Sequence, residues 1–249
     1  MSISDLKDVP PWEWPLNAAE TILETLGDQN APDADRHLAA GMAGDTTVVN
    51  DELADALLVI IGNQNETDDL RGRAAIALGP VLEWGFIEDF DDPAEIPISE
   101  SMFNRIRQTF HQLYQMVNLP KLVRRRILEA SVRAPMDWHR DAIREAYGQD
   151  DGDWKLTAVF CMQFIRGFDK EILESLSSKN PDIVYEAVCG AGNWEIKAAW
   201  PHIAAIVASE DSEKDLLLAG IEAAAFIRPG EAAELLNHFL NSDDEDIVD

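Results

Sequence analysis

Two segments of the chain, 68–79 and 181–192, share one pattern of side chains although they are far apart in the sequence. They read DDLRGRAAIALG and PDIVYEAVCGAG. Each has an acidic residue, then an aliphatic one (Leu70 or Ile183), and then mostly small residues up to a glycine. Acidic and proline residues at the start indicate helices. A helix with so few bulky side chains cannot form a core alone, so the pattern predicts close packing against other helices.

The pattern recurs along the chain, which predicts a helical repeat protein. Its aliphatic or equivalent position falls at Ala34, Leu70, Val123, Trp154, Ile183 and Leu216. Between these segments lie helices with bulkier apolar stripes, and strand patterns are nearly absent. We call the small-residue member of each helix pair the inner helix and the bulkier member the outer helix. No pair can bury its apolar stripe alone, so stacking of the pairs must supply the core.

The segment 68–79 resembles the HEAT repeat, in the short bacterial form also found in phycobilin lyases. The resemblance rests on an acidic residue, an aliphatic residue and an arginine, followed by AAxALG, and it extends over 34–249 in spacing and character. It implies an all-α fold, a right-handed α-solenoid (α–α superhelix) of about six to seven HEAT-like helix pairs. In that family the arginine usually forms an ion pair between repeats. By this resemblance Arg71 and Arg124 are structural.

The repeat also predicts the domain organisation. Residues 1–15, with Trp12 and Trp14, are expected to cap the open end of the array, and 16–249 to form a single solenoid. The segment 86–100 is rich in proline and acidic residues, so we expect an acidic surface loop inserted in the array. The segment 242–249 has the pattern of the first turn of another inner helix. It predicts that the native chain continues beyond Asp249, or that this helix is frayed.

The charge of the chain disfavours several classes of ligand. Its 47 acidic and 20 basic residues give a formal net charge of −27, which repels nucleic acid and anionic membranes and favours basic partners. The longest apolar run is too short to cross a bilayer, and the start of the chain has no signal-peptide pattern. We therefore expect a cytoplasmic protein without membrane contact. Cys161 and Cys189 form no disulfide framework and are expected to be reduced.

No pattern in the sequence predicts a catalytic or metal site. The five histidines are isolated and lack metal-ligand spacing, and no serine or cysteine has the context of a nucleophile. We expect no metal and no cofactor, and an enzyme is disfavoured. Because HEAT-like families include phycobilin lyases and DNA alkylation-repair glycosylases, enzymes of these two kinds stay as alternatives. A subunit of a larger assembly is a third alternative.

A basic centre and one helix face define the expected binding surface. Residues 101–144 include nine basic and three acidic residues, which either pair with the acidic insert 86–100 or bind an acidic ligand. Counting 100° per residue from each repeated position places the residues two, three and six positions later on the concave face of a solenoid. The partner-binding residues that we select from this face are Arg73, Arg125, Arg126, Phe160, Tyr185 and Leu218.

The concave face changes in character along the array. The same counting also places Arg36, His37, Ala40, Gly72, Ile76, Leu156, Thr157 and Glu186 on it. Arginines at one end and apolar and aromatic residues at the other are typical of protein-binding surfaces. The sequence therefore predicts a non-enzymatic protein-binding or scaffold module, whose partner is another protein or peptide segment, acidic at the basic centre. If the counting is off by one residue, Phe160 lies in the core instead.

Overall fold

The structure is a computed structural model that describes residues 2–90, 96–209, 211–237 and 239. These residues form helices and no strand, and they divide into two compact units, residues 1–136 and 137–249. Each unit is a stack of helix pairs. The all-α, helical-repeat solenoid that the sequence predicts is therefore confirmed.

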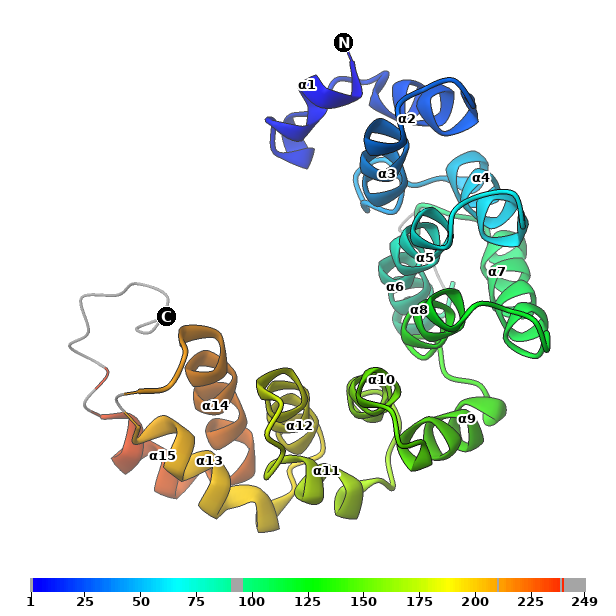
Figure 1. Ribbon diagram of the computed structural model, residues 1–249. Coiled ribbons are helices and arrows are strands. Elements are labelled where there is room, and N and C mark those ends of the chain that lie inside the picture. Colours follow the sequence, from blue (N-terminus) through cyan, green and yellow to red (C-terminus); the bar gives the residue numbers. More distant parts are fainter. Residues whose placement is uncertain (1, 91–95, 210, 238, 240–249) are drawn as a thin grey trace. The chain divides into compact units, whose positions relative to one another are not determined.

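In the first unit the inner and outer helices form two separate rows. The inner row is α3 (Asp33–Met42), α5 (Asp68–Ala77) and α8 (Lys121–Ser131). The outer row is α2 (Ala18–Gly27), α4 (Asp51–Gly62) and α7 (Glu100–Tyr114). Within each row, successive helices contact one another, and the rows are visible in Figure 1. A further helix, α6 (Gly79–Glu88), packs against α8 and α7.

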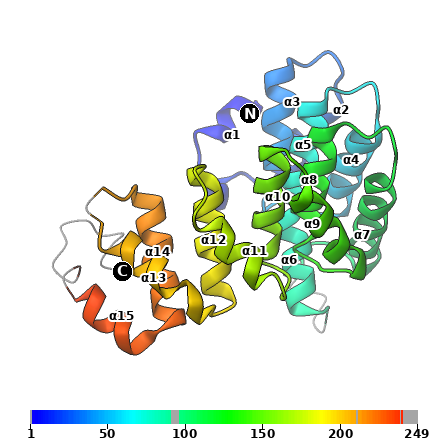
Figure 2. The same ribbon diagram turned by 60° about the horizontal axis from the view of Figure 1, so that its bottom comes forward.

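The second unit repeats this arrangement. Its inner row is α10 (Gly152–Met162), α12 (Pro181–Asn193) and α14 (Lys214–Ile227). The outer helices are α9 (Asp137–Gly148), α11 (Asp169–Ser175), α13 (Trp200–Val207) and α15 (Pro229–Leu236), and a 3₁₀ turn, η2, covers Lys197–Ala199. Along the inner row α12 contacts both α10 and α14, and Figure 2 shows the same helices from another side.

Small side chains allow the inner helices to approach closely. A Cβ atom on Gly44, just after α3, would lie 1.8 Å from the carbonyl oxygen of Ala77 in α5. In the second unit, a Cβ on Gly192 in α12 would lie 3.0 Å from Cα of Ala223 in α14. The small residues are therefore required by the contact between neighbouring repeats. Leu70 and Ile183, the repeated aliphatic residues, are buried as predicted.

Arginines of the inner helices bind the C-terminal ends of the preceding outer helices. Arg71 Nε donates to the carbonyl of Ile61 in α4, at 2.9 Å, and Arg124 Nη2 donates to the carbonyl of Met116, just after α7, at 2.5 Å. Carbonyls at a helix C-terminus lack partners within the helix, so an arginine there satisfies them. Both arginines thus have structural contacts.

Arg36 corresponds to Arg71, and its position differs from the prediction. Its Nη2 donates to the carbonyl of Leu26 in α2, at 3.2 Å, and the guanidinium forms a bidentate ion pair with Glu66, with N–O distances of 2.7 and 2.8 Å. Arg36 is buried, not on the exposed face. The counting from Ala34 is therefore off by one, because the first turn of α3 has acidic residues and a single alanine but no bulky apolar residue that marks the buried side.

The N-terminal segment contains α1 (Ile3–Lys7) and a 3₁₀ turn, η1 (Pro11–Glu13). Ile3 and Leu6 are buried, and α1 contacts α2 and α3. Trp14 Nε1 donates to the carbonyls of Leu6 and Val9, at 3.0 and 2.9 Å, whereas Trp12 is 77% exposed. The residues that cover this end are thus Ile3 and Leu6, and Trp12 does not plug it.

The ends of two helices lie within the segment 86–100, where an acidic loop is expected. The helix α6 continues to Glu88 and α7 begins at Glu100. Proline and acidic residues favour a loop, so the sequence does not predict these helix ends. Residues 91–95 lie outside the described residues. So do residues 240–249, which include the predicted start of a further inner helix. A single array over 16–249 stays a prediction.

Candidate partner-binding surfaces

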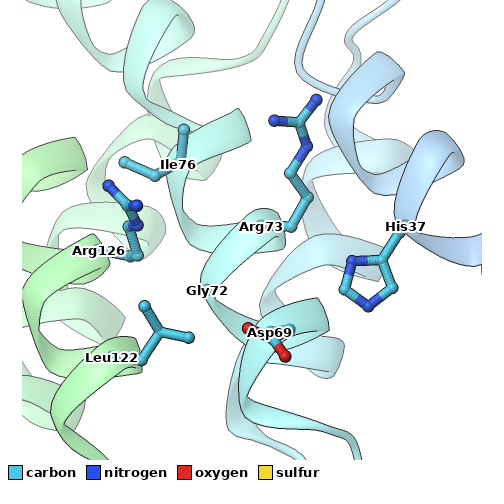
Figure 3. A pocket seen from close by; sticks show the side chains of 7 residues that line it. All are labelled: His37, Asp69, Gly72, Arg73, Ile76, Leu122 and Arg126. Carbon is cyan, nitrogen blue, oxygen red and sulfur yellow. The ribbon is translucent and has the colours of Figure 1, made fainter.

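A pocket of about 500 Å³ opens on the inner helices of the first unit. It is lined by His37 from α3, by Asp69, Gly72, Arg73 and Ile76 from α5, and by Leu122 and Arg126 from α8. Figure 3 shows Arg126 and Leu122 on one side of Gly72, and Arg73 and His37 on the other. The structure thus brings together five residues that the sequence placed on the concave face, and it adds Asp69 and Leu122.

Two glycines make room for this pocket, which we call the arginine pocket. A Cβ on Gly72 would lie 3.3 Å from Cγ of Arg126, so a larger residue there would fill the floor. A Cβ on Gly41 of α3 would lie 2.2 Å from Nη2 of Arg73, so the guanidinium rests against bare backbone. Glycine at these positions lets a neighbouring side chain come close to the helix.

The two arginines of the pocket differ in their partners. Arg126 Nη1 forms an ion pair with Glu129 Oε2, at 2.6 Å. Arg73 is exposed, and no described residue forms a hydrogen bond or ion pair with it. Unlike Arg126, Arg73 therefore offers its full hydrogen-bonding capacity to a ligand.

Arg125 is not part of the arginine pocket. It is buried, and its Nη2 lies 3.9 Å from Oε1 of the buried Glu129. The predicted position on the surface is wrong for this side chain, since Arg125 is buried beside Glu129 of the same helix. Glu129 is thus flanked by Arg125 and Arg126, which compensates for its burial.

The second unit has a pocket of about 450 Å³ on its inner helices, which we call the tyrosine pocket. Its lining is Leu156 from α10, Pro181, Asp182, Tyr185 and Glu186 from α12, Leu216 and Asp215 from α14, and Glu213 just before α14. Tyr185 is 37% exposed. The sequence predicted Leu156, Tyr185 and Glu186 on this face but missed the other carboxylates. Acidic residues in the first turn of a helix have a sufficient local reason there, the helix dipole, and the sequence does not show which of them the stacking of helices brings together.

The other predicted residues of the second unit lie outside this pocket. Phe160 is half-buried, and its ring lies 5.4 Å from that of Phe164. Leu218 is also half-buried, whereas Thr157 is fully buried. The position three residues after Trp154 is therefore buried, unlike the equivalent position of Arg73. A partner-binding role for Phe160 and Leu218 stays a prediction.

Cys189 and Tyr185 lie one turn apart on α12. Burial, followed by the charge of Glu186, raises the pKa of Cys189 to about 11. Cys189 itself, together with burial, raises the pKa of Tyr185. At neutral pH both side chains are protonated, so the Cys189 thiol lacks the thiolate form that nucleophilic catalysis requires.

The described part of the chain contains neither a cluster of metal ligands nor a membrane-spanning helix. No group of three or more His, Cys, Asp or Glu side chains in it could hold a metal ion. Within the same residues, no helix has both the length and the apolar character needed to cross a membrane.

No protein-family model matches the chain, and no curated protein matches it. Several solved structures are similar in fold. YibA of Escherichia coli is 12% identical, with a TM-score of 0.50, over 93% of this chain and 79% of YibA. The complex of CpcE and CpcF of phycocyanin lyase from Nostoc is 17% identical, with a TM-score of 0.45, over 97% of this chain and 94% of that one.

A designed armadillo repeat protein is 9% identical, with a TM-score of 0.36, over 91% of this chain and 94% of the designed protein. At these identities the comparisons concern the fold alone. The repeated helix pairs of the structure agree with the resemblance stated from the sequence. In fold, the chain is similar to HEAT- and armadillo-like helical repeat proteins.

Proposed function

We propose that the chain is a non-enzymatic protein-binding module, and that its arginine pocket binds an acidic segment of a partner protein. The observation that carries this proposal is Arg73, an exposed arginine held against Gly41 without an ion-pair partner among the described residues. Arginine is enriched in binding hot spots, and aliphatic side chains beside it add apolar area that a partner can cover. Ile76 and Leu122 supply the aliphatic side chains here.

The pairing of the basic centre bears on this proposal. Among the described residues, Arg105 pairs with Asp55, Arg126 with Glu129, and Arg133 with Glu83. The described carboxylates of the segment 86–100, namely Glu88, Asp89 and Glu100, form no ion pair with these arginines. Much of the basic centre is therefore neutralised inside the first unit, and Arg73 is the better candidate for an acidic ligand.

A peptide-display selection tests the proposal. We expect the whole chain to enrich peptides that carry acidic residues next to an aliphatic residue. Arg73→Glu should weaken the binding of a selected peptide at least tenfold by fluorescence anisotropy, because a charge-assisted hydrogen bond to a carboxylate is lost and a repulsion is added. Ile76→Ser, on the same face, should weaken binding about threefold to tenfold, in line with a lost aliphatic contact.

Lys179→Glu is the matched control, since Lys179 is exposed, lies in the second unit and does not line either pocket. It changes the net charge as much as Arg73→Glu and should bind as the wild type does. Equal binding by Arg73→Glu and Lys179→Glu would refute the role of the arginine pocket. Failure to enrich acidic peptides would do so as well.

A further inference from the structure

The tyrosine pocket of the second unit is lined partly by apolar and aromatic side chains, of which Leu156 and Leu216 are half-buried and Tyr185 is exposed. Leu156, Leu216 and Pro181 surround Tyr185, which comes from the middle of the three inner helices of this unit. A pocket of about 450 Å³ lies within the range of small-ligand sites and can accept one long side chain. Tyrosine is enriched in the hot spots of protein-binding surfaces.

The rim of this pocket is negatively charged. Four carboxylates line it, Asp182, Glu186, Glu213 and Asp215, and among the described residues of the lining none is basic. Gln163 donates a hydrogen bond to Glu186. For Asp182, Glu213 and Asp215 the described residues provide no ion pair.

Helix stabilisation explains the position of these acids but does not cancel their charge. Asp182 and Asp215 lie in the first turns of α12 and α14, where an acid interacts favourably with the helix dipole. The nearby Lys155 is directed elsewhere, because its Nζ lies 4.0 Å from Glu174 and 4.8 Å from the centre of the Tyr147 ring. The charged side chains that line the pocket are therefore all of one sign.

We infer that the tyrosine pocket binds an arginine side chain from a basic segment of a partner protein. The guanidinium can stack on the face of Tyr185 while its N–H groups donate to rim carboxylates, and its methylene groups can contact Leu156 and Leu216. Lysine lacks the planar group that stacks and forms bidentate pairs, so arginine is favoured. The charge of the whole chain, −27, attracts a basic partner at long range and repels nucleic acid.

This inference extends the proposed function to a second surface with the opposite charge preference. The two surfaces lie on different units, and they involve different residues. The tyrosine pocket can therefore bind an arginine side chain whether or not the arginine pocket binds acidic peptides.

The experiment uses the full chain and three fluorescein-labelled peptides with the same leucine and glycine framework. One contains four arginines, one four lysines, and one four citrullines, which are uncharged analogues of arginine. Anisotropy at 150 mM salt measures the dissociation constants. We expect the arginine peptide to bind at least threefold more tightly than the lysine peptide, and the citrulline peptide to show no binding.

Variants of the pocket separate a specific site from general attraction. Asp182→Asn combined with Asp215→Asn should weaken the arginine peptide at least tenfold. The matched control is Asp150→Asn with Glu234→Gln, which removes two exposed carboxylates outside the pocket. It should change the dissociation constant less than twofold.

Substitutions of Tyr185 test the aromatic contact. Tyr185→Ala should weaken binding at least fivefold, and Tyr185→Phe should retain it because the ring is kept. Circular dichroism reports whether each variant is folded. If Tyr185→Ala does not fold, Tyr185→Phe provides the test.

The inference is overturned if the arginine peptide does not bind, or if the pocket pair and the control pair weaken it equally. It is also overturned if Tyr185→Phe loses binding. Arg73→Glu should leave the arginine peptide unaffected. If the arginine peptide and the tyrosine-pocket variants behave as expected but the acidic-peptide selection fails, only the proposed role of the arginine pocket is refuted.

Discussion

Gly44→Ala tests the idea that small side chains are required where the inner helices meet. The added Cβ would lie 1.8 Å from the carbonyl oxygen of Ala77, 2.5 Å from its carbonyl carbon and 2.8 Å from its Cα. Nonbonded heavy atoms prefer separations of roughly 3.5 Å. The ends of α3 and α5 would therefore have to separate by about 1.5 Å, because backbone atoms cannot rotate away as a side chain can.

The size of the effect follows from this geometry. Overpacking in a dense core costs about 1–3 kcal/mol. Because the clash at Gly44 is with backbone, we expect the upper end, a loss of about 3 kcal/mol in the free energy of unfolding. For a chain of this length, each kcal/mol lowers the melting temperature by about 2–4 °C. Gly44→Ala should therefore melt about 6–12 °C below the wild type.

Urea denaturation and thermal melting measure the change, with Gly62→Ala as the control. Gly62 ends α4, and no atom lies within 4 Å of the position of its added Cβ. The control should stay within about 0.5 kcal/mol of the wild type, as is usual for surface substitutions. Hydrogen exchange should show the lost protection of Gly44→Ala in α3 and α5 and not in α12 and α14. If Gly44→Ala is as stable as Gly62→Ala, the close packing of small residues does not hold the repeats together.

Two further predictions concern single side chains. Glu66→Gln leaves the buried Arg36 without its carboxylate and should cost about 3–5 kcal/mol. Because Arg36 lowers the pKa of Glu66 below 4.5, this contribution is present above pH 4.5 and is lost as the pH falls through the lowered pKa. The stability difference between Glu66→Gln and the wild type in urea should therefore shrink below pH 4.5, and a constant difference down to pH 3 would contradict the assignment. In a Cys161→Ser background, the rate at which iodoacetamide alkylates Cys189 should rise about tenfold per pH unit up to pH 10, because the pKa of Cys189 is about 11. Mass spectrometry measures this rate, and a plateau by pH 9 would contradict that pKa.

The repeat could be predicted from the sequence because it depends on local pattern. Leu70 and Ile183 each follow an acidic residue and precede a stretch rich in small residues, and both are buried. Gly44 and Gly192 are among the small residues of the pattern, and each lies in close contact with the neighbouring inner helix. In α3, whose first turn has acids and an alanine but no bulky residue, the same counting is off by one. Periodicity thus locates a helix face only where one side chain clearly defines the core.

The pockets were only partly predictable, because they depend on residues that the sequence separates. Arg73 and Arg126 come from different helices, and their common pocket exists because Gly72 between them has no side chain. The acids at the rim of the tyrosine pocket likewise come from two inner helices. Each residue has a sufficient local explanation by itself, and only the stacking of the repeats brings them together.

The position of an arginine within the repeat predicts its role in this protein better than the number of charged residues around it does. Arg71 and Arg124 both follow the repeated aliphatic residue directly, and both donate to carbonyls at the end of the preceding outer helix. Arg73, two residues further along α5, lies on the exposed side and has no ion pair among the described residues. The dense run of arginines in α8 therefore serves mainly to hold repeats together and to neutralise the buried Glu129. Since a ligand competes with such internal partners for every charge, the isolated Arg73 contributes more to an acidic ligand than the run itself.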